Sequence, residues 1–310
     1  MDNLTEVKEF LLTGFSDTWE LQVLHAGLFL LIYLAAMMGN LLIMMVITLS
    51  QCLHTPMYFF LKNLSFLDLC YISVTMPKSI HSSLTHNNSI SYLGCAAQVY
   101  FFFAFASAEL ACLTVMSYDR YVAICHPLHY GARMTSGKCH QISAIAWFTC
   151  FSYATVHTGN MFGEPISRSN RIHQFFCDIP QVLALVSCEM FLVEFVSLAI
   201  SSCLVVCFVL MIISYYRIFS TVFRIPSVES RAKAFSTRSP QLIVTVLFLT
   251  TRLFAALGPS APTSSIQDVV IAMAYTIFPP FLNPIIYSLR NKEIKASIWR
   301  LFNKIQPLQK

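Results

Sequence analysis

Long apolar stretches separated by short polar segments dominate the 310-residue chain. A helix needs about 20 apolar residues to cross the hydrocarbon core of a bilayer. Seven stretches reach that length, at 24–48, 56–80, 92–119, 140–160, 192–216, 236–258 and 267–289. They do not alternate between apolar and polar residues, which argues against an outer-membrane barrel. The pattern predicts an all-α integral membrane protein, a seven-transmembrane helix bundle.

The composition narrows the class of protein further. Hydrophobic residues make up 56% of the chain and charged residues 11%, against roughly a quarter charged in soluble domains. A soluble globule of this size could not bury so many apolar side chains, so a soluble enzyme, a disordered chain and a nucleic-acid-binding protein are excluded. The 11 cysteines are scattered without a CxxC pair, which excludes a zinc module.

The positions of the basic residues set the expected orientation. Of the 20 Lys and Arg residues, fourteen fall on one side of the spans, four on the other and two inside spans, and the positive side faces the cytoplasm. We therefore expect one domain over 1–310, with an extracellular N-terminus (1–23), a helical bundle (24–289) and a cytoplasmic tail (290–310). No cleavable signal peptide is evident, so the first span is expected to act as the anchor. Asn3 begins a glycosylation sequon on the outer side.

Residues 292–304 combine basic and apolar positions in the manner of a short amphipathic helix on the membrane surface. This helix completes the expected fold, a seven-helix bundle with a short C-terminal amphipathic helix.

Four polar residues fall at similar depth inside the spans, and such residues are costly in lipid. They are Asn40, Asp68, Glu109 and Asn283. If they converge, the carboxyl groups of Asp68 and Glu109 would repel each other unless they share a cation or a proton. A sodium ion between them and a protonated carboxyl group bonded to neighbouring side chains are both open at this point.

Arg252 lies in the outer half of the sixth span and has three explanations. Its side chain can snorkel to the outer surface, pair with an acidic residue of the long outer loop such as Asp178 or Glu189, or bind an acidic or carbonyl-bearing ligand. On the same side, Cys95 opens the third span, and Cys177 and Cys188 lie in the long loop. Because this side faces an oxidising compartment, a bridge is expected. A Cys95–Cys177 bridge would hold the loop across the mouth of the bundle as a lid.

At the inner end of the third span stands the triplet Asp119-Arg120-Tyr121, about one helix length after Cys95. The adjacent acid and base can pair at the membrane edge. All nine histidines fall at span ends or in loops without an HExxH pattern, so an intramembrane enzyme is not expected.

Several motifs in order give the chain a resemblance to olfactory (odorant) receptors, a family of rhodopsin-like G-protein-coupled receptors. They are Gly39-Asn40, Pro56 to Leu61, Leu64 to Asp68, Met116 to Cys125, His126 to Tyr130, Ser214-Tyr215, Lys233 to Thr237 and Pro280 to Asn291. The resemblance implies a plasma-membrane receptor, not an enzyme, that binds small volatile odorants. It also implies a stimulatory olfactory-type G protein as partner, which raises cyclic AMP. No nucleic-acid partner and no cofactor other than the candidate sodium ion are expected.

The resemblance also implies roles for residues at the inner end. Asp119 and Arg120 match the lock that holds the third and sixth spans together at rest. Tyr215 and Tyr287 match tyrosines that swing toward this arginine on activation. Asn283, Pro284 and Tyr287 match the switch of the seventh span, and Asp68 with Glu109 matches an acidic pair that holds sodium.

In this family the ligand lies among the outer halves of the third, fifth, sixth and seventh spans. Helical spacing from Cys95 directs four residues of the third span toward the bundle centre, Phe102, Phe103, Ala106 and Ser107. The candidates on the other three spans are Ala199, Ser202, Cys203, Leu249, Arg252, Leu253, Ala256, Met273 and Thr276.

The sequence departs from the family pattern in two places. Arg238, Gln241 and Leu249 replace the usual residues of the sixth span, which puts the activation relay in doubt. Ser167 replaces the usual partner of a second loop cysteine, which leaves Cys188 without an evident partner. A small-solute transporter and a non-signalling receptor relic are the alternative functions.

Overall fold

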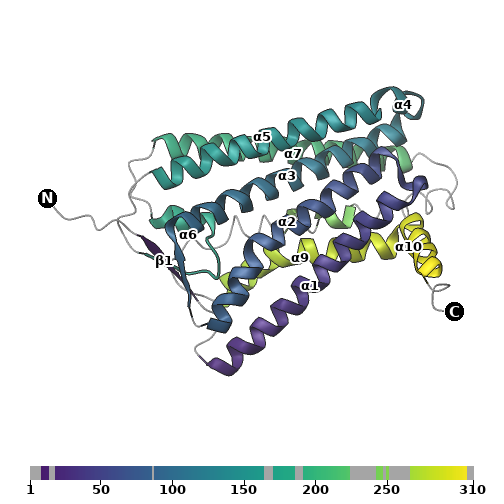
Figure 1. The fold of residues 1–310 in the computed structure, drawn as a ribbon. Coiled ribbons are helices and arrows are strands. Elements are labelled where there is room, and N and C mark those ends of the chain that lie inside the picture. Colours follow the sequence, from purple (N-terminus) through teal and green to yellow (C-terminus); the bar gives the residue numbers. More distant parts are fainter. Residues whose placement is uncertain are drawn as a thin grey trace.

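The computed structural model describes residues 8–13, 18–85, 87–163, 170–185, 191–223, 242–246, 249–250 and 266–305. Long helices running side by side make up most of this part of the chain (Figure 1). These are α1 (Trp19–Leu49), α2 (Pro56–Thr85), α3 (Tyr92–Cys125), α5 (Ser136–Gly163), α7 (Phe191–Phe223) and α9 (Ile266–Arg290). The short helices are η1 (Gln51–Leu53), η2 (Pro127–His129), α4 (Tyr130–Arg133), α6 (Ile179–Leu185) and α10 (Lys292–Ile305).

The long helices confirm the predicted spans wherever these are described. Six of the seven predicted spans fall inside a helix, and the helices run beyond the apolar stretches, as α3 does by reaching Cys125. Within the described residues, α1, α2, α3, α7 and α9 each hold a segment long and apolar enough to cross a membrane. The less apolar α5 has 28 residues and is therefore about 42 Å long. Of the sixth predicted span, only 242–246 and 249–250 are described, and both are helical.

The three prolines inside α9 remove backbone donors, and neighbouring helices replace two of them. Pro284 cannot donate to the carbonyl of Pro280, and Asn40 Nδ2 of α1 donates to that oxygen at 2.8 Å. Pro279 likewise frees the carbonyl of Tyr275, which accepts from the Tyr71 hydroxyl of α2 at 3.2 Å. These contacts explain how a helix with prolines is tolerated in lipid, where a carbonyl without a partner is costly.

A three-stranded sheet at one end of the bundle was not expected from the sequence. Its order is β2 (Ser89–Ser91), β1 (Glu9–Leu12) and β3 (Arg171–Ile172). The central strand β1 is antiparallel to β2 and parallel to β3, with Phe10 opposite Ile90 and Leu12 opposite Ile172. Along β1 the side chains of Phe10 and Leu12 are buried and the two alternate residues are exposed, which is the pattern of a strand with one face on a core.

The sheet and the tail helix lie at opposite ends of the bundle. Figure 1 shows β1 and α6 at one end, and α4 and α10 at the other. Asn291 caps α10, because its Oδ1 accepts from the backbone N–H groups of Glu293 and Ile294. Ile294 is buried in the bundle core, whereas Trp299 is exposed. The predicted C-terminal helix is therefore present, and the Tyr58 hydroxyl of α2 anchors it by donating to Glu293 at 2.8 Å.

Candidate functional site

The outer end of the bundle is closed by a loop that a disulfide holds in place. Cys95 of α3 and Cys177 are bonded, with their Cα atoms 5.6 Å apart, which confirms the predicted bridge. Gln98, one helical turn along α3, donates to the Val74 carbonyl of α2 and accepts from the backbone N–H of Cys177. The loop is thus tied to α3 twice, at a point where α3 is itself bonded to α2. Cys188, Glu189 and Ser167 lie outside the described residues.

Two aromatic residues of this loop reach into the outer half of the bundle. Phe175 and Phe176 are buried, and the ring centre of Phe176 lies 5.3 Å from that of Phe102 and 6.2 Å from that of Tyr275. The Tyr275 hydroxyl donates to Asp178 Oδ2 at 2.7 Å. The loop therefore fills the space between α3 and α9. Sequence reasoning missed this role, although the aromatic pair directly before Cys177 was a signal.

The predicted ligand residues separate into two groups around α3. Phe102 packs with Tyr71, Phe176 and Tyr275, and Ala106 and Met273 pack against the same cluster. Phe103 instead contacts the rings of Tyr153 and His157 on α5.

The remaining predicted ligand residues lie apart from these two groups or cannot be placed. Ser107 is half-buried. Thr276 is buried and its hydroxyl donates to Ala272 of its own helix at 2.7 Å. Leu249 packs against a buried cluster that includes Leu113, Met116 and Tyr287, the inner core cluster. The side chains of Ala199, Ser202, Cys203, Arg252, Leu253 and Ala256 lie outside the described part of the structure, as do Arg238 and Gln241.

His157 lies near a span end, as expected, but its side chain has a contact that the sequence did not show. It is in the outer half of α5, six residues before the helix ends at Gly163, and its side chain is 6% exposed. The imidazole stacks on Phe103 with ring centres 4.8 Å apart and planes at 14°. The contact between His157 and Phe103 could not be predicted from the sequence, because it depends on how α3 and α5 are rotated.

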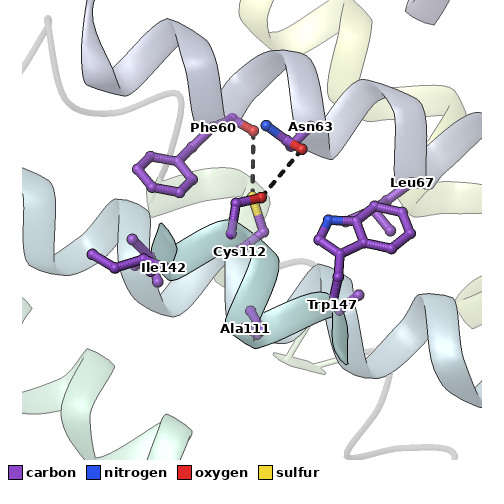
Figure 2. A pocket seen from close by; sticks show the side chains of 11 residues that line it. Phe60, Asn63, Leu67, Ala111, Cys112, Ile142 and Trp147 are labelled. Atoms are coloured by element: carbon purple, nitrogen blue, oxygen red, sulfur yellow. Dashed lines mark hydrogen bonds between the residues drawn. The ribbon is translucent and has the colours of Figure 1, made fainter. Parts of the chain in front are cut away.

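A small crevice between α2, α3 and α5 contains none of the predicted ligand residues. Its walls include Phe60, Asn63, Cys112, Ile142 and Trp147 (Figure 2). The space open to the centre of a water molecule is about 10 Å³, which is room for about one water. Figure 2 shows the Cys112 thiol directed at the Phe60 carbonyl, a hydrogen bond of 3.3 Å. This crevice is too small for an odorant.

The two membrane carboxyl groups are both buried and interact with each other. Asp68 is fully buried and accepts from Asn283 Nδ2 at 2.9 and 3.2 Å. Glu109 is 1% exposed and interacts electrostatically with Asp68. Asn40, the fourth polar residue, binds the Pro280 carbonyl instead. The Oδ1 atom of Asn283 is buried and has no hydrogen-bond partner in the described part of the chain. An acceptor atom on a residue bonded to one of two interacting carboxyl groups suits a shared cation or proton.

At the inner end of α3, Asp119 and Arg120 contact different neighbours. The Tyr130 hydroxyl of α4 donates to Asp119 Oδ1 at 2.8 Å. The Arg120 guanidinium donates to the Met57 sulfur at the start of α2. Burial and the Asp119 charge raise the pKa of the Tyr130 hydroxyl. The inner start of the sixth span lies outside the described residues, so a lock between Arg120 and that span stays a prediction.

The remaining switch residues lie on α3, α7 and α9. Tyr287 is buried in the inner core cluster with Met116 and Ile294. Tyr215 of α7 lies 3.4 Å from the Thr245 hydroxyl of the sixth span. Tyr121 bonds the His126 ring at 3.0 Å. Pro284 packs on Gly39, where an added Cβ atom would lie 3.0 Å from the proline ring.

Comparisons with known proteins agree with this arrangement. Residues 29–305 match the olfactory receptor family. The chain is 75% identical to human olfactory receptor 14I1 over the full length of both chains. It is 54% identical to human olfactory receptor 14A16, with 97% of each chain covered. It is 50% identical to human olfactory receptor 14L1, with 96% of this chain and 92% of the relative covered.

This multi-pass helix bundle has the fold of a seven-helix G-protein-coupled receptor. The chain belongs to the olfactory receptor family. By family it is a plasma-membrane signalling receptor for odorants and not an enzyme.

Proposed function

We propose that the protein binds small volatile odorants in the outer half of the bundle and activates a stimulatory olfactory-type G protein, which raises cyclic AMP. The N-terminus is extracellular and the C-terminus cytoplasmic in this proposal. β1 and α10 at opposite ends of the bundle agree with that orientation, and so does the excess of basic residues on the tail side.

The arrangement at the inner end of α3 carries the proposal. Arg120 is held at Met57 and Asp119 at Tyr130, so the charged pair is fixed at the face where a G protein would bind. Directly after α3, the Leu128 side chain is 95% exposed. A large apolar side chain at a polar surface is a suitable anchor for a partner protein.

Leu128→Asp tests this proposal in cells that co-express the receptor with an olfactory-type G protein. We expect the odorant-driven rise in cyclic AMP to fall at least about tenfold at equal surface level, since a buried interface anchor contributes about 2 kcal/mol or more. Leu93→Asp is the matched control, because Leu93 is also highly exposed but lies at the outer end of α3. Equal responses of wild type and Leu128→Asp would contradict the proposed G-protein contact.

A bound sodium ion is part of the same proposal. Asp68 and Glu109 would hold it, with the Oδ1 atom of Asn283 as a third oxygen ligand, and the ion would supply the positive charge that two neighbouring carboxylates require. We expect sodium chloride to raise the unfolding temperature of the purified receptor relative to choline chloride. The gain is about 1.4 kcal/mol at a sodium concentration ten times the Kd. Asp68→Asn should remove the difference. Identical unfolding in both salts would favour a shared proton instead.

A further inference from the structure

The outer half of α5 contains two polar atoms, on consecutive residues, that are buried without hydrogen-bond partners in the described part of the chain. They are His157 Nδ1 and Thr158 Oγ1, and neither has a partner among the described residues. The side chains of both residues are at least nine-tenths buried. Most buried polar atoms in folded proteins are paired, because an unpaired one lowers stability. The unpaired nitrogen of the His157 ring therefore points to a group that the protein alone does not supply.

The surroundings of the imidazole are apolar. Phe103, Ala104 and Ala154 form a small buried cluster at this place, and half-buried Phe151 and Ile179 pack against it. Phe103 covers one face of the His157 ring in a nearly parallel stack. The stack fixes the plane of the imidazole ring, and the ring nitrogens can therefore form hydrogen bonds only in that plane. None of these packed side chains carries a charge, so nothing among them would compensate a ligand anion removed from water.

We propose that His157 is the hydrogen-bonding anchor for a neutral oxygen atom of the odorant, a hydroxyl or carbonyl group. The proposal rests on the odorant-receptor function proposed above and names the chemical class of its ligand. A neutral imidazole has one N–H donor and one acceptor nitrogen. An alcohol can bond to Nδ1 in either tautomer, whereas a carbonyl group requires Nδ1 to carry the proton. The apolar remainder of the ligand would contact aromatic side chains such as Phe103.

Two sets of probes on constant carbon skeletons test the proposal. Octan-1-ol, octanal, octanoate and octane form one set, and benzyl alcohol, benzaldehyde, benzoate and toluene form the other. The readout is cyclic AMP in cells co-expressing the receptor and an olfactory-type G protein, with surface level measured through an N-terminal tag. We expect the neutral oxygenated probes to be the most potent activators of the wild type.

The variants separate the hydrogen bond from the shape of the ring. His157→Phe keeps an aromatic ring on Phe103 and should weaken the alcohols and aldehydes about tenfold, the loss expected for one hydrogen bond in an apolar site. His157→Asn places an amide near the position of Nδ1 and should stay within about threefold of wild type. His157→Gln extends the amide toward the position of Nε2 and should not rescue. His140→Phe is the matched control, because His140 lies at the other end of α5 beside Phe59, and should leave all potencies unchanged.

The outcomes distinguish this inference from the proposed function. Activation by carboxylates or hydrocarbons alone overturns the inference and leaves odorant reception intact. Unchanged potency of the alcohols and aldehydes in His157→Phe also overturns it. Silence of the surface-expressed wild type toward every probe counts against both.

Thermal unfolding of the receptor without any probe tests the role of the imidazole and needs no agonist. An imidazole without a partner contributes little to stability, so His157→Phe should unfold at the wild-type temperature or above. A clear drop would show that the imidazole is a structural partner, and that result would overturn the inference.

Discussion

Replacing Tyr71 by phenylalanine tests whether α2 supplies the hydrogen bond that Pro279 removes from α9. The Tyr71 hydroxyl is buried and donates to the Tyr275 carbonyl at 3.2 Å. Phenylalanine keeps the ring, which packs on Phe102 with centres 4.9 Å apart, and deletes only the oxygen. Because Pro279 has no N–H group, the Tyr275 carbonyl would lose its partner from α2 without gaining one from its own helix.

The expected cost is about 1–3 kcal/mol, the range for a buried carbonyl left without a hydrogen bond. For a chain of this size that cost lowers the unfolding temperature by roughly 2–6 °C. The measurement is thermal unfolding of the purified receptor followed by tryptophan fluorescence. Tyr33→Phe is the matched control, since the Tyr33 hydroxyl bonds the Ser73 hydroxyl, which keeps its bond to the Leu69 carbonyl. We expect a loss below about 0.5 kcal/mol there.

A double-mutant cycle with Pro279→Ala makes the test specific. Alanine restores an N–H group at residue 279, which can bond the Tyr275 carbonyl within α9. In that background Tyr71→Phe should cost less than about 0.5 kcal/mol, so the coupling energy should be about 1 kcal/mol or more. If Tyr71→Phe costs the same with proline and with alanine at 279, the explanation given for the proline-containing helix is wrong.

Two further substitutions test the packing around the bundle. Gly39→Val would force α1 and α9 apart, because even the first added carbon lies 3.0 Å from the Pro284 ring, and we expect a loss of about 1–3 kcal/mol in thermal unfolding. An unchanged unfolding temperature would show that the two helices can separate freely. Phe10→Ala removes the fully buried side chain of β1 and should cost about 3 kcal/mol, seen as lower unfolding temperature and surface level. Leu11→Ala on the exposed face of the same strand is its control and should behave as wild type.

The helices were predictable because the requirement that forms them is local in the sequence. Backbone groups in lipid must be bonded, and a helix bonds nearly all of them within its own segment, so an apolar run of sufficient length is a helix whatever it packs against. The predicted spans at 56–80 and 267–289 accordingly fall inside α2 and α9. The bridge between Cys95 and Cys177 was predicted on a different ground, because both thiols fall on the side of the spans that is expected to face an oxidising compartment.

The sheet was not predictable, because its strands are too short to give a pattern. β1 has four residues, β2 three and β3 two. Phe10 is buried only because residues near 90 and 171, far away in the chain, pair with its strand. The sequence of the N-terminal segment contains no sign of these partners.

At the candidate ligand site, too, the sequence predicted some features and could not predict others. Helical spacing placed Phe102 and Phe103 together, but Phe102 meets the loop and α9 while Phe103 meets α5. Adjacent residues on a helix are about 100° apart, so small differences in helix rotation decide which neighbour each one contacts. His157 was missed for that reason.

The sequence by itself determined that the chain crosses a membrane, which residues form its spans, that Asp68 and Glu109 lie inside them, and that the Asp119-Arg120 pair lies at the end of the third. Only the tertiary structure decided that Arg120 rests on Met57, that Asn40 and Tyr71 bond the carbonyls freed in α9, and that Phe176 fills the outer bundle. Burial in lipid depends on the composition of each segment alone, whereas a contact between side chains depends on how several helices rotate and pack against one another.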